Sequence, residues 1–503
     1  MTDVVLINPG AARTIYQNLS DDLSAIEPPT WCRMIAGWLI DRGFDVAILD
    51  QDAWRWTPEE VAEQVKKFNS RLVAIVVSGQ QPSASTQQMT GASLLAKAIQ
   101  GVRKIMVGNH PSALPERTLF EEDVDYVCDG EGPFTLLGLL NDDPLPDIPG
   151  LVWREPLHEA VDYVEHLPKI IQNQRAQLID VDELHGDVWG LLQMDRYRSH
   201  TWQCLDGSPR QPYASIYTSL GCPFKCSFCC INAFQHSSNY RRRTPSKVVE
   251  QIKHLYQMYG VKTFKIADEM FVLDPRHYLP ICEGLAALPF AGELNIWAYA
   301  RIDTVKPETL SLMRRAGIQW LALGIESGSA HVRDGAIKSL DEDDIHGTVK
   351  AIQDAGISVI GNFIFGLPDD TMESMQATLK LAKSLDLEFS NFYVAQAYPG
   401  SKLFDQAKPE DLPESWSGYS QHSFECKPLP TDTLSSAEVL RFRDGAFKDF
   451  YTNQDYQASL VKKFGTQGFD NIRRMMSAGA LPRKLLTGNT SPKIWWPDYA
   501  DNC

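Results

Sequence analysis

Three cysteines lie close together in the segment Gly221–Cys230, at Cys222, Cys226 and Cys229, in the pattern Cys-x3-Cys-x2-Cys. Three thiolates on one loop can bind three irons of a cubane iron–sulfur cluster, which needs four ligands when the protein supplies all of them. The fourth iron is then open to a small molecule, as the open position of a catalytic zinc site is. The spacing therefore indicates a reactive cluster rather than an electron carrier.

Two other interpretations of these cysteines stay open. Free cysteine is among the most buried residue types, so the three thiols could simply pack in a core. CxxC-type spacings also bind zinc, but zinc needs a second pair of ligands, and no further CxxC or HxxxH pattern is evident. Cys230 lies outside the spacing. As a fourth ligand it would close the open iron, so we expect it to be structural.

The composition is that of a globular protein with several domains. The chain has 503 residues, 44% of them hydrophobic and 22% charged, and it is long for a single core. Its 48 basic and 64 acidic residues give a net charge of −16, which disfavours a nucleic acid or an anionic membrane as a partner. The basic run Arg241–Arg243 is too short to change that sign.

The sequence also gives an expectation for the compartment. No apolar run approaches the ~20 residues of a membrane-spanning helix, and the segment Met1–Val4 lacks the features of a signal peptide. Several of the ten cysteines are scattered singly, which favours reduced thiols over a disulfide framework. We therefore expect a cytoplasmic protein without a membrane span, which also suits an oxygen-sensitive cluster.

The first 140 residues alternate apolar runs with helical patterns. The run Val4–Ile7 ends at Asn8, and Thr57-Pro58 begins a helix with an N-cap residue and a proline at its first position. Continuous apolar strands separated by helices predict an α/β fold, a doubly wound parallel sheet of the Rossmann or flavodoxin-like type over residues 1–140. The expected strands are 4–7, 45–49, 72–77, 105–107 and 126–127.

Small and polar residues follow the strands of this first domain. In a parallel sheet, ligands bind beyond the carboxyl ends of the strands, and glycine lets a bulky ligand approach the backbone. Each such turn alone is as compatible with a tight turn as with a site, but four at one edge favour a ligand. The candidate binding residues are Asn8, Ser78, Gly79, Gly108, Asn109, His110, Gly130 and Glu131.

Residues 141–210 are predicted to be a connector, because the segment Asp142–Pro149 is rich in breakers and periodicity stays weak up to about Tyr213. From there a βα rhythm predicts a partial (β/α)6 barrel over residues 211–405, in which function sits at the carboxyl ends of the strands. The expected strands lie near 215–217, 263–266, 295–297, 320–325, 359–364 and 392–395.

The spacing of Cys222, Cys226 and Cys229, combined with this barrel pattern, resembles the signature of the radical S-adenosylmethionine superfamily. The resemblance implies that the three cysteines bind a [4Fe-4S] cluster whose open iron chelates the amino and carboxylate groups of S-adenosylmethionine. Reductive cleavage of the sulfonium would then give a 5′-deoxyadenosyl radical. It also implies an external electron donor such as flavodoxin or ferredoxin.

The same resemblance implies roles for residues at other strand ends. Asp268 and Glu269 match the position that contacts the amino group of the cofactor, a charge-assisted bond that suits a carboxylate. Arg301 is a partner for the cofactor carboxylate, and Glu326 matches a strand end that touches the ribose or the methionine. A salt bridge at the barrel mouth is the simpler alternative for each. The further cofactor-binding matches are Phe228, Gly366 and Tyr398.

The first domain carries a second, more diffuse resemblance. The strings Gly108-x-His110-Pro111 and Gly130-Glu131-Gly132 resemble the cobalamin-binding domain that is fused to many radical S-adenosylmethionine enzymes. The Asp-x-His-x-x-Gly motif, which supplies a histidine ligand to cobalt in other cobalamin proteins, is absent, and the matching region is Asp50-Gln51-Asp52-Ala53-Trp54. If cobalamin binds, we expect no histidine from that loop on cobalt, and a hydrogen-bonding role for His110.

Residues 406–503 lie outside the barrel pattern and are expected to form a small, mainly helical subdomain. A helical pattern runs from Ser436 to Tyr451. The subdomain either only packs against the barrel or forms a cap that shapes the substrate site, because aromatic side chains serve both purposes. Its aromatic residues include Trp416, Tyr419, Phe424, Trp495, Trp496 and Tyr499.

Together the two resemblances imply a cobalamin-dependent methyltransferase that places a methyl group from methylcobalamin on an unactivated carbon of a small molecule or peptide. A second hypothesis keeps both cofactors but replaces methyl transfer with cyclisation, oxidation or rearrangement. A third hypothesis, from another class, is a non-catalytic iron–sulfur sensor or electron-transfer protein, which leaves the polar strand ends without a purpose. The sequence assigns no catalytic residue beyond the cofactor ligands.

Overall fold

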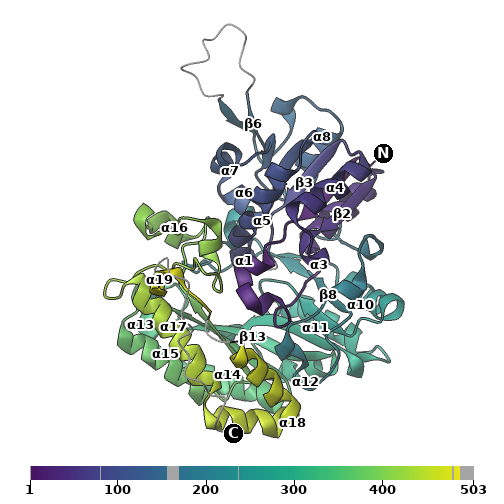
Figure 1. The fold of residues 1–503 in the computed structure, drawn as a ribbon. Helices are drawn as coiled ribbons and strands as arrows, with labels where there is room; N and C mark the ends of the chain where they lie inside the picture. The colour runs from purple at the N-terminus through teal and green to yellow at the C-terminus, as the bar shows by residue number, and fades with distance from the viewer. Residues whose placement is uncertain (1, 80, 156–168, 236, 479–480, 488–503) are drawn as a thin grey trace.

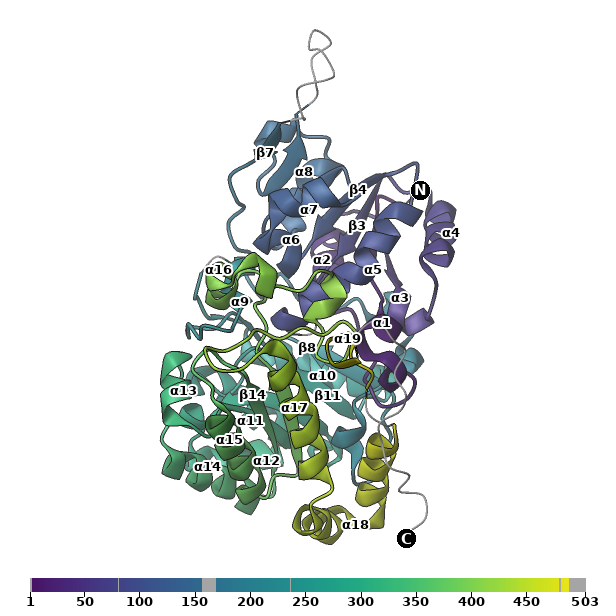
Figure 2. The same cartoon turned by 60° about the vertical axis from the view of Figure 1, so that its left-hand side comes forward.

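A computed structural model describes the chain except for residues 1, 80, 156–168, 236, 479–480 and 488–503 (Figure 1). It contains two large sheets, one in each half of the chain, the first mostly and the second entirely parallel, and a helical segment after the second sheet (Figures 1 and 2). This confirms the predicted α/β class and the predicted succession of a doubly wound sheet, a partial barrel and a helical C-terminus. Trp495, Trp496 and Tyr499 lie outside the described residues.

The first sheet is parallel through its first five strands and has the order of a flavodoxin-like fold. Two further antiparallel strands extend it into residues 141–210, which were predicted to be a connector, so the sheet runs past residue 140. From one edge to the other, the strands are β2 (Val46–Asp50), β1 (Val4–Asn8), β3 (Leu72–Val76), β4 (Arg103–Val107), β5 (Tyr126–Cys128), β6 (Leu151–Arg154) and β7 (Ile170–Gln172).

Helices cover both faces of this sheet, because alternate strand residues are buried on opposite sides. Val4 and Leu6 pack with α2 (Thr30–Ile40) and α8 (Pro133–Leu140). Val5 and Ile7 pack on the other side with α4 (Pro58–Phe68) and α5 (Ser85–Ala98). As predicted, α4 begins with Thr57 as N-cap, and Glu60 completes a capping box.

The second sheet has six parallel strands in sequential order from β8 onward. Helices connect the strands from β11 to β15, which confirms the predicted six-stranded partial barrel. The strands are β8 (Tyr213–Ile216), β11 (Thr263–Ile266), β12 (Asn295–Arg301), β13 (Ile318–Glu326), β14 (Ser358–Phe365) and β15 (Phe389–Val394), and the helices are α10 (Pro245–Tyr259), α11 (Pro275–Ala286), α12 (Pro307–Arg315), α14 (Glu342–Asp354) and α15 (Met372–Ser384).

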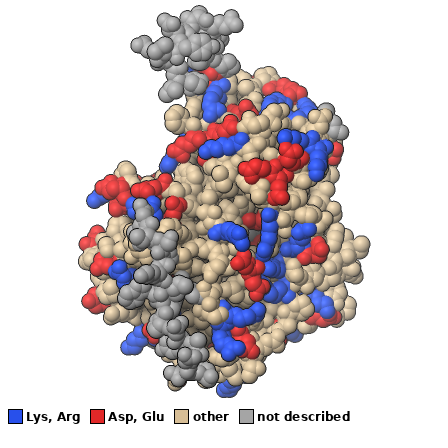
Figure 3. All heavy atoms as spheres, viewed as in Figure 1, with Lys and Arg blue, Asp and Glu red and all other residues tan. Residues whose placement is uncertain are grey.

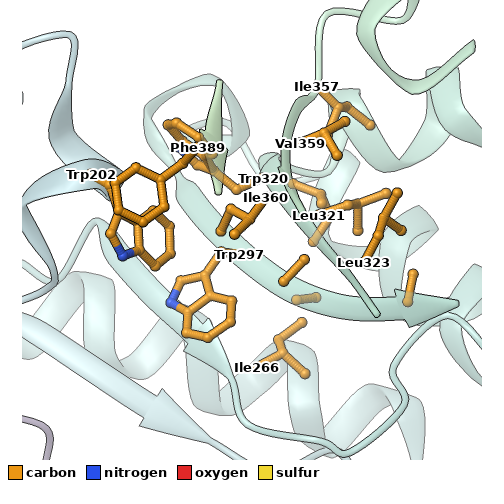
Figure 4. Close-up of a cluster of buried hydrophobic side chains, with 14 of the residues drawn as sticks. Trp202, Ile266, Trp297, Trp320, Leu321, Leu323, Ile357, Val359, Ile360 and Phe389 are labelled. Atoms are coloured by element: carbon orange, nitrogen blue, oxygen red, sulfur yellow. The ribbon is translucent and has the colours of Figure 1, made fainter. Parts of the chain in front are cut away.

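Aromatic side chains close the amino end of the barrel (Figure 4). Trp202 comes from the segment before β8 and lies 5.3 Å from Trp297 and 5.5 Å from Trp320, measured between ring centroids. Both partners lie near the first residues of their strands, and Phe389, the first residue of β15, lies 5.8 Å from Trp202. Edge-to-face and tilted contacts of this kind fill the barrel base, so the opposite, carboxyl end remains for ligands.

The C-terminal helices lie against the open edge of the barrel sheet. Helix α17 (Ser436–Tyr451) begins with a capping box formed by Ser435 and Glu438, and it packs beside β15, where the hydroxyl of Tyr451 donates to the carbonyl of Ser390 at 2.6 Å. Helix α18 (Gln454–Ser477) follows it, and its Phe464 ring is parallel to that of Trp320. The helix predicted from Ser436 to Tyr451 therefore has the bounds that the sequence indicated.

Charges of both signs are interspersed over the face drawn in Figure 3, in keeping with the acidic composition rather than with a basic binding surface. Among the residues that the structure describes, no helix is both long enough and apolar enough to cross a membrane.

Buried ionic contacts join the first domain to the barrel. Glu131 follows β5, and its carboxylate accepts hydrogen bonds from the guanidinium of Arg241 and from the amide of Ile179. Arg33 of α2 is 1% exposed and donates to the carbonyls of Ser215 and Gly186 at 2.6 and 2.7 Å. Charges buried in this way are stable only when they are hydrogen-bonded, so both contacts fix how the two sheets meet.

Replacing Glu131 with alanine leaves Arg241 without its charged partner at this junction. We expect Glu131→Ala to lower the free energy of unfolding by about 2–3 kcal/mol, somewhat less than for a fully buried pair, because Arg241 keeps some contact with solvent. Urea unfolding followed by tryptophan fluorescence measures this. The control is Glu121→Ala, which removes an exposed ion pair with Arg117 and should cost less than about 0.5 kcal/mol. Equal losses in the two variants would show that the Glu131 contact does not couple the domains.

Candidate functional site

One large cavity lies where the first domain, the barrel mouth and the C-terminal segment meet. Its volume is about 1110 Å³, more than a single small ligand needs. The carboxyl ends of β1 and β3 border it, which is the point where the strand order of the first sheet reverses. Of the residues predicted to bind cofactors, those on its wall are Asn8, Ser78, Gly79, Cys222, Cys226, Phe228, Cys229, Glu269, Arg301, Glu326 and Tyr398.

The cysteine loop starts from a buried anchor at the end of β11. The carboxylate of Asp268 is fully buried and accepts hydrogen bonds from the amide and hydroxyl of Thr218 and from the hydroxyl of Ser219. Burial raises the pKa of Asp268, and these donors act against that rise. Asp268 is not on the cavity wall, and in this structure it holds the loop, so its predicted contact with the cofactor stays a prediction.

The backbone of the loop turns sharply before the first cysteine. Gly221 has φ +90°, and a Cβ atom there would come within 2.1 Å of the carbonyl oxygen of Asn239. At the far side of the loop, the amide of Ser227 donates to the carbonyl of Ala336 at 3.2 Å. Only glycine fits the turn, which explains why this residue precedes Cys222.

All three predicted cluster cysteines lie on the cavity wall as free thiols. Burial raises the pKa of Cys222 to about 11 and also raises that of Cys226, so these thiols lose their protons only to a strong partner such as iron. Among the described residues, no three His, Cys, Asp or Glu side chains converge on a single metal ion. A cubane cluster does not need such convergence, because each cysteine binds a different iron.

Arg301 and Phe224 lie beside the second cysteine. The guanidinium of Arg301 is 3.8 Å from the Sγ atom of Cys226 and 3.8 Å from the centre of the Phe224 ring. Asp303 accepts from the same guanidinium at 2.9 and 3.0 Å. Arg301 therefore supplies positive charge at the edge of the cysteine loop, next to the place where the resemblance puts the cofactor.

Glu269 is the carboxylate of the Asp268–Glu269 pair that faces the cavity. It accepts a hydrogen bond from the amide of Gly221 at 3.0 Å. Burial raises the pKa of Glu269 to about 8. A carboxyl group in this state gains a partner when a cationic amino group binds beside it, so Glu269 fits the predicted amino contact better than its neighbour does.

Glu326 and Lys338 form a buried ion pair on the same wall. Glu326, the last residue of β13, accepts from the Nζ atom of Lys338 at 2.5 Å, and both side chains are less than 10% exposed. A Cβ atom on Gly324 would come within 2.4 Å of that Nζ atom, so the glycine makes room for the lysine. The sequence predicted Glu326 but missed Lys338, which lies in a loop without a motif. Lys338 is a candidate partner for a ligand carboxylate.

Gly366 and Tyr398, two of the further predicted cofactor-binding residues, occupy different places. Tyr398 is on the cavity wall, where its hydroxyl donates to the Oε1 atom of Gln396 at 2.8 Å. Gly366 is not, because it supports packing instead: its φ is +79°, and a Cβ atom would meet Val439 of α17 at 2.5 Å. Phe228 borders the cavity and packs against the buried cluster of Val332, Ala336, Leu367 and Ala395.

The first-domain end of the cavity contains buried polar atoms that have no partner among the described residues. They are the Nε2 atom of Gln81, the Oε1 atom of Gln88 and the Oγ1 atom of Thr90, and all three side chains border the cavity. Buried polar groups are normally hydrogen-bonded, so these atoms fit a ligand with amide or phosphate groups of its own. The donor set suits cobalamin, whose corrin ring carries amide side chains.

Asp52 stands in the cavity wall at the position of the absent motif histidine. Burial, together with the nearby carboxylate of Asp50, raises the pKa of Asp52 to about 7. Its side chain accepts a long hydrogen bond, 3.4 Å, from the amide of Ala12. Asp50, by contrast, accepts from Asn8, Ala53 and Tyr197 and holds the loop in place.

Five predicted residues of the first domain lie away from this cavity. A Cβ atom on Gly108 would meet the carbonyl of Val77, so that glycine allows two strand ends to pack closely. His110 is buried, interacts with Thr86 at 3.2 Å through Nδ1 and lies edge-on to Trp416. The other three are Asn109, which accepts from Ser78, Gly130, which borders a small separate cavity, and Glu131, which forms the junction with Arg241.

A buried charge cluster that sequence reasoning missed lies deeper in the barrel. Lys265 projects from β11, and its Nζ atom is 3.1 Å from a carboxylate oxygen of Glu27, which precedes α2. His200 lies 3.7 Å from the other oxygen of Glu27. Although burial opposes ionisation, Lys265 and His200 hold the pKa of Glu27 below its usual value. No local pattern marks this cluster, because its members come from three distant segments.

Comparisons with known proteins agree with this geometry. Residues 216–382 match the family model described as the Radical SAM superfamily, and residues 21–140 match the B12 binding domain. An uncharacterized methyltransferase from Pyrococcus horikoshii is 29% identical over 398 residues, which cover 76% of this chain and 79% of the relative. An anaerobic magnesium-protoporphyrin IX monomethyl ester cyclase from Cereibacter sphaeroides is 23% identical over 501 residues, covering 96% of this chain and 75% of the relative.

A solved structure resembles the whole arrangement. The radical S-adenosylmethionine methyltransferase TsrM from Kitasatospora setae, with cobalamin and a [4Fe-4S] cluster bound, matches with a TM-score of 0.66 and covers 95% of this chain and 100% of that chain. The two sequences are 16% identical, so the likeness concerns the fold.

The exclusion of Cys230 from the cluster can be tested directly. Cys230 borders the same cavity, but it is only 6% exposed and lies outside the Cys-x3-Cys-x2-Cys spacing. We expect Cys230→Ala to keep the iron and sulfide content of the anaerobically reconstituted protein, whereas Cys226→Ala loses most of both. Iron and sulfide analysis and the electron paramagnetic resonance of the reduced cluster measure this. A loss in Cys230→Ala as large as that in Cys226→Ala would make Cys230 a ligand.

The raised pKa of Asp52 predicts a pH-dependent instability of the protein without cofactors. The folded state binds this proton more tightly than the unfolded state, whose pKa is about 4, so the contribution of Asp52 to stability is lost as the pH rises toward 7. We expect Asp52→Asn to be more stable than the wild type at pH 8, on the order of 1 kcal/mol because cavity water screens the group, with the difference vanishing toward pH 4.

Thermal denaturation of the cofactor-free protein across that pH range measures the effect. The control is Asp143→Asn, which changes an exposed carboxylate and should follow the wild type at every pH. A constant difference between Asp52→Asn and the wild type would show that Asp52 does not titrate in this range.

Proposed function

The chain belongs to the radical S-adenosylmethionine superfamily and carries a B12-binding domain, and from this premise we propose that it is a methyltransferase that acts on an unactivated carbon of a small molecule or peptide. These matches confirm the superfamily, the enzyme class and the cofactor set predicted from the sequence, namely a [4Fe-4S] cluster, S-adenosylmethionine and cobalamin.

The observation that carries the proposal is the large cavity shared by the first domain, the barrel and the C-terminal segment. It is bordered at once by the ends of β1 and β3, by Cys222, Cys226 and Cys229, and by residues of the C-terminal segment. An enzyme that moves a methyl group between two cofactors and a substrate needs all three within reach of one another, shielded from water. A sensor or an electron carrier has no need for such a shared space.

The bound groups supply the chemistry, and the chain supplies position. When bound, the cluster and S-adenosylmethionine provide a 5′-deoxyadenosyl radical, and cobalamin provides the methyl group. In this proposal Glu269 would accept a hydrogen bond from the amino group of S-adenosylmethionine, and Arg301, beside Cys226, would add positive charge near its carboxylate. Phe228 and Tyr398 line the cavity beside them and exclude water.

The reaction balances with two molecules of S-adenosylmethionine. One gives up its methyl group and becomes S-adenosylhomocysteine. The other takes one electron from an external donor and one hydrogen atom from the substrate carbon, and becomes 5′-deoxyadenosine and methionine. A second electron is needed because the methyl group leaves S-adenosylmethionine as a cation equivalent and joins a substrate radical. The electrons come from an external donor, and we infer a flavodoxin or ferredoxin in a cytoplasmic setting, where thiols and clusters stay reduced.

A second candidate function rests on the cyclase relative. Its sequence aligns with 96% of this chain, so the same arrangement of domains also serves a relative whose name describes ring closure. In that case the radical step remains, and no methyl group is transferred to the substrate.

The products distinguish these functions. The anaerobic enzyme, loaded with cluster and cobalamin, is incubated with S-adenosylmethionine, a reductant and candidate substrates. We expect S-adenosylhomocysteine, 5′-deoxyadenosine and a substrate heavier by one methylene unit. Deoxyadenosine with an oxidised or cyclised product, and no S-adenosylhomocysteine, would favour the second function. Absence of both nucleoside products would contradict both, and Cys226→Ala serves as the inactive control.

A further inference from the structure

The C-terminal segment contributes a wall of the cavity, which we call the C-terminal wall. Its members come from the loop after β15, from α17 and from the region at the end of α18. They are Gln421, His422, Arg443, Asp444, Phe447, Met475, Met476 and Leu481. The sequence left open whether this segment only packs or also shapes a site. These positions make it part of the site.

Two buried arginines and one partly exposed aspartate underlie this wall. Asp444 accepts from Arg483 at 3.1 Å through two guanidinium nitrogens and from Arg443 at 2.8 Å. Arg483 is 1% exposed, and its third nitrogen donates to the carbonyl of Ser423, so its donors face protein. Although burial opposes ionisation, the two arginines hold the pKa of Asp444 below its usual value. The group therefore carries two positive charges against one negative charge.

Arg443 is the member of this group that faces the cavity. It donates through Nε to the carbonyl of Phe392 and through Nη1 to Asp444. Its Nη2 atom makes no hydrogen bond to any residue that the structure describes. The side chain is 7% exposed, so the guanidinium is held at a fixed place by its two bonds. A fixed, partly satisfied guanidinium is the group that proteins use to bind carboxylates and phosphates.

The other buried cations on the cavity wall are already paired one to one among the described residues. Each faces a carboxylate at 3.1 Å or less: Lys265 with Glu27, Arg301 with Asp303, and Lys338 with Glu326. In contrast to these three pairs, the group of Arg443, Arg483 and Asp444 has one positive charge in excess. Burying such an excess is costly unless a ligand supplies the missing negative charge.

Apart from Asp444 and Arg483, the neighbours of Arg443 on the C-terminal wall are uncharged and largely apolar. His422 is kept neutral, because burial and the two arginines lower its pKa well below the usual value. Phe447, Met475 and Met476 border the same part of the wall, and Tyr393 follows the residue whose carbonyl Arg443 binds. An apolar body with one anionic group would satisfy both parts of this surface.

We propose that the substrate binds the C-terminal wall through an anionic oxygen group, a carboxylate or a phosphate, held by Arg443. This inference rests on the proposed function, since it concerns the substrate of that reaction. It places the anion at α17 and leaves the apolar body of the substrate to extend into the cavity shared with the cysteine loop. The C-terminal wall then selects the substrate class, while the barrel and the first domain hold the cofactors.

Binding of matched small probes tests the proposal without turnover. The probes are phenylacetate, phenyl phosphate and the neutral phenylacetamide, titrated calorimetrically into the protein loaded with cluster and cobalamin. We expect at least one of the anions to bind about tenfold more tightly than the amide, as one charge-assisted pair allows. The stronger of the two anions identifies a carboxylate or a phosphate as the preferred group.

Variants on α17 supply the controls. Arg443→Gln should abolish the preference for the anion, and Arg443→Lys should keep part of it. Arg441→Gln, an exposed position on the same helix, should bind like the wild type. Because Arg443 also holds Asp444, Asp444→Asn gives a second test: it removes the competing negative charge and should strengthen anion binding.

Two results would overturn the proposal. One is equal binding, or none, of the anions and the amide to the wild type. The other is an anion preference that survives in Arg443→Gln. Formation of 5′-deoxyadenosine from S-adenosylmethionine, measured on the same protein, is independent of these titrations. Failure of methyl transfer therefore remains distinguishable from failure of anion recognition.

Discussion

The buried carboxyl group of Asp268 is the contact on which the site depends. It is fully buried after β11, and three donors from Thr218 and Ser219 converge on it. Since a buried carboxyl group is costly without hydrogen bonds, the start of the cysteine loop cannot move away from the end of β11. Strands β8 and β11 are parallel neighbours, so this contact fixes the loop at the mouth of the barrel. The Glu326–Lys338 pair and Arg301 border the same cavity as the cysteine loop.

The same logic operates at a larger scale between the domains. Glu131, in the loop after β5, and Arg33, on α2, bind residues of the barrel half: Glu131 binds Arg241, and Arg33 binds the carbonyl of Ser215. Their charges are satisfied only when the two halves meet in one way. The cavity lies between the first domain and the barrel, which these contacts hold together. Its shape is therefore set by contacts that do not themselves touch a ligand.

The sequence predicted whatever depends on local pattern. Cysteine spacing, the six strands of the barrel, the capped start of α4 and the bounds of α17 all follow from neighbouring residues. Prediction from the sequence failed where the role of a residue depends on a partner far away in the chain. Glu131 was placed correctly at a strand end, but its partner Arg241 lies 110 positions away, so the sequence could not tell a ligand contact from an interdomain one. In the same way the sequence could not show that Asp268 binds Thr218 and Ser219, which lie 50 and 49 positions away. Strands β6 and β7 were missed because they lie in the segment where the apolar periodicity is weak.

The two ends of the cavity differ in how their polar groups are satisfied, and this difference says what each end is built for. Around the cysteine loop, Glu326 and Arg301 have charged partners, so the electrostatic environment exists before any ligand arrives. At the first-domain end, Gln88, Thr90 and Asp52 have unmet or weak hydrogen bonds. A ligand bound there supplies the missing hydrogen bonds, and its binding free energy adds to the stability of the folded state. A cofactor that stays bound through many turnovers belongs at such an end, and a cofactor that is consumed and exchanged belongs at the preorganised one.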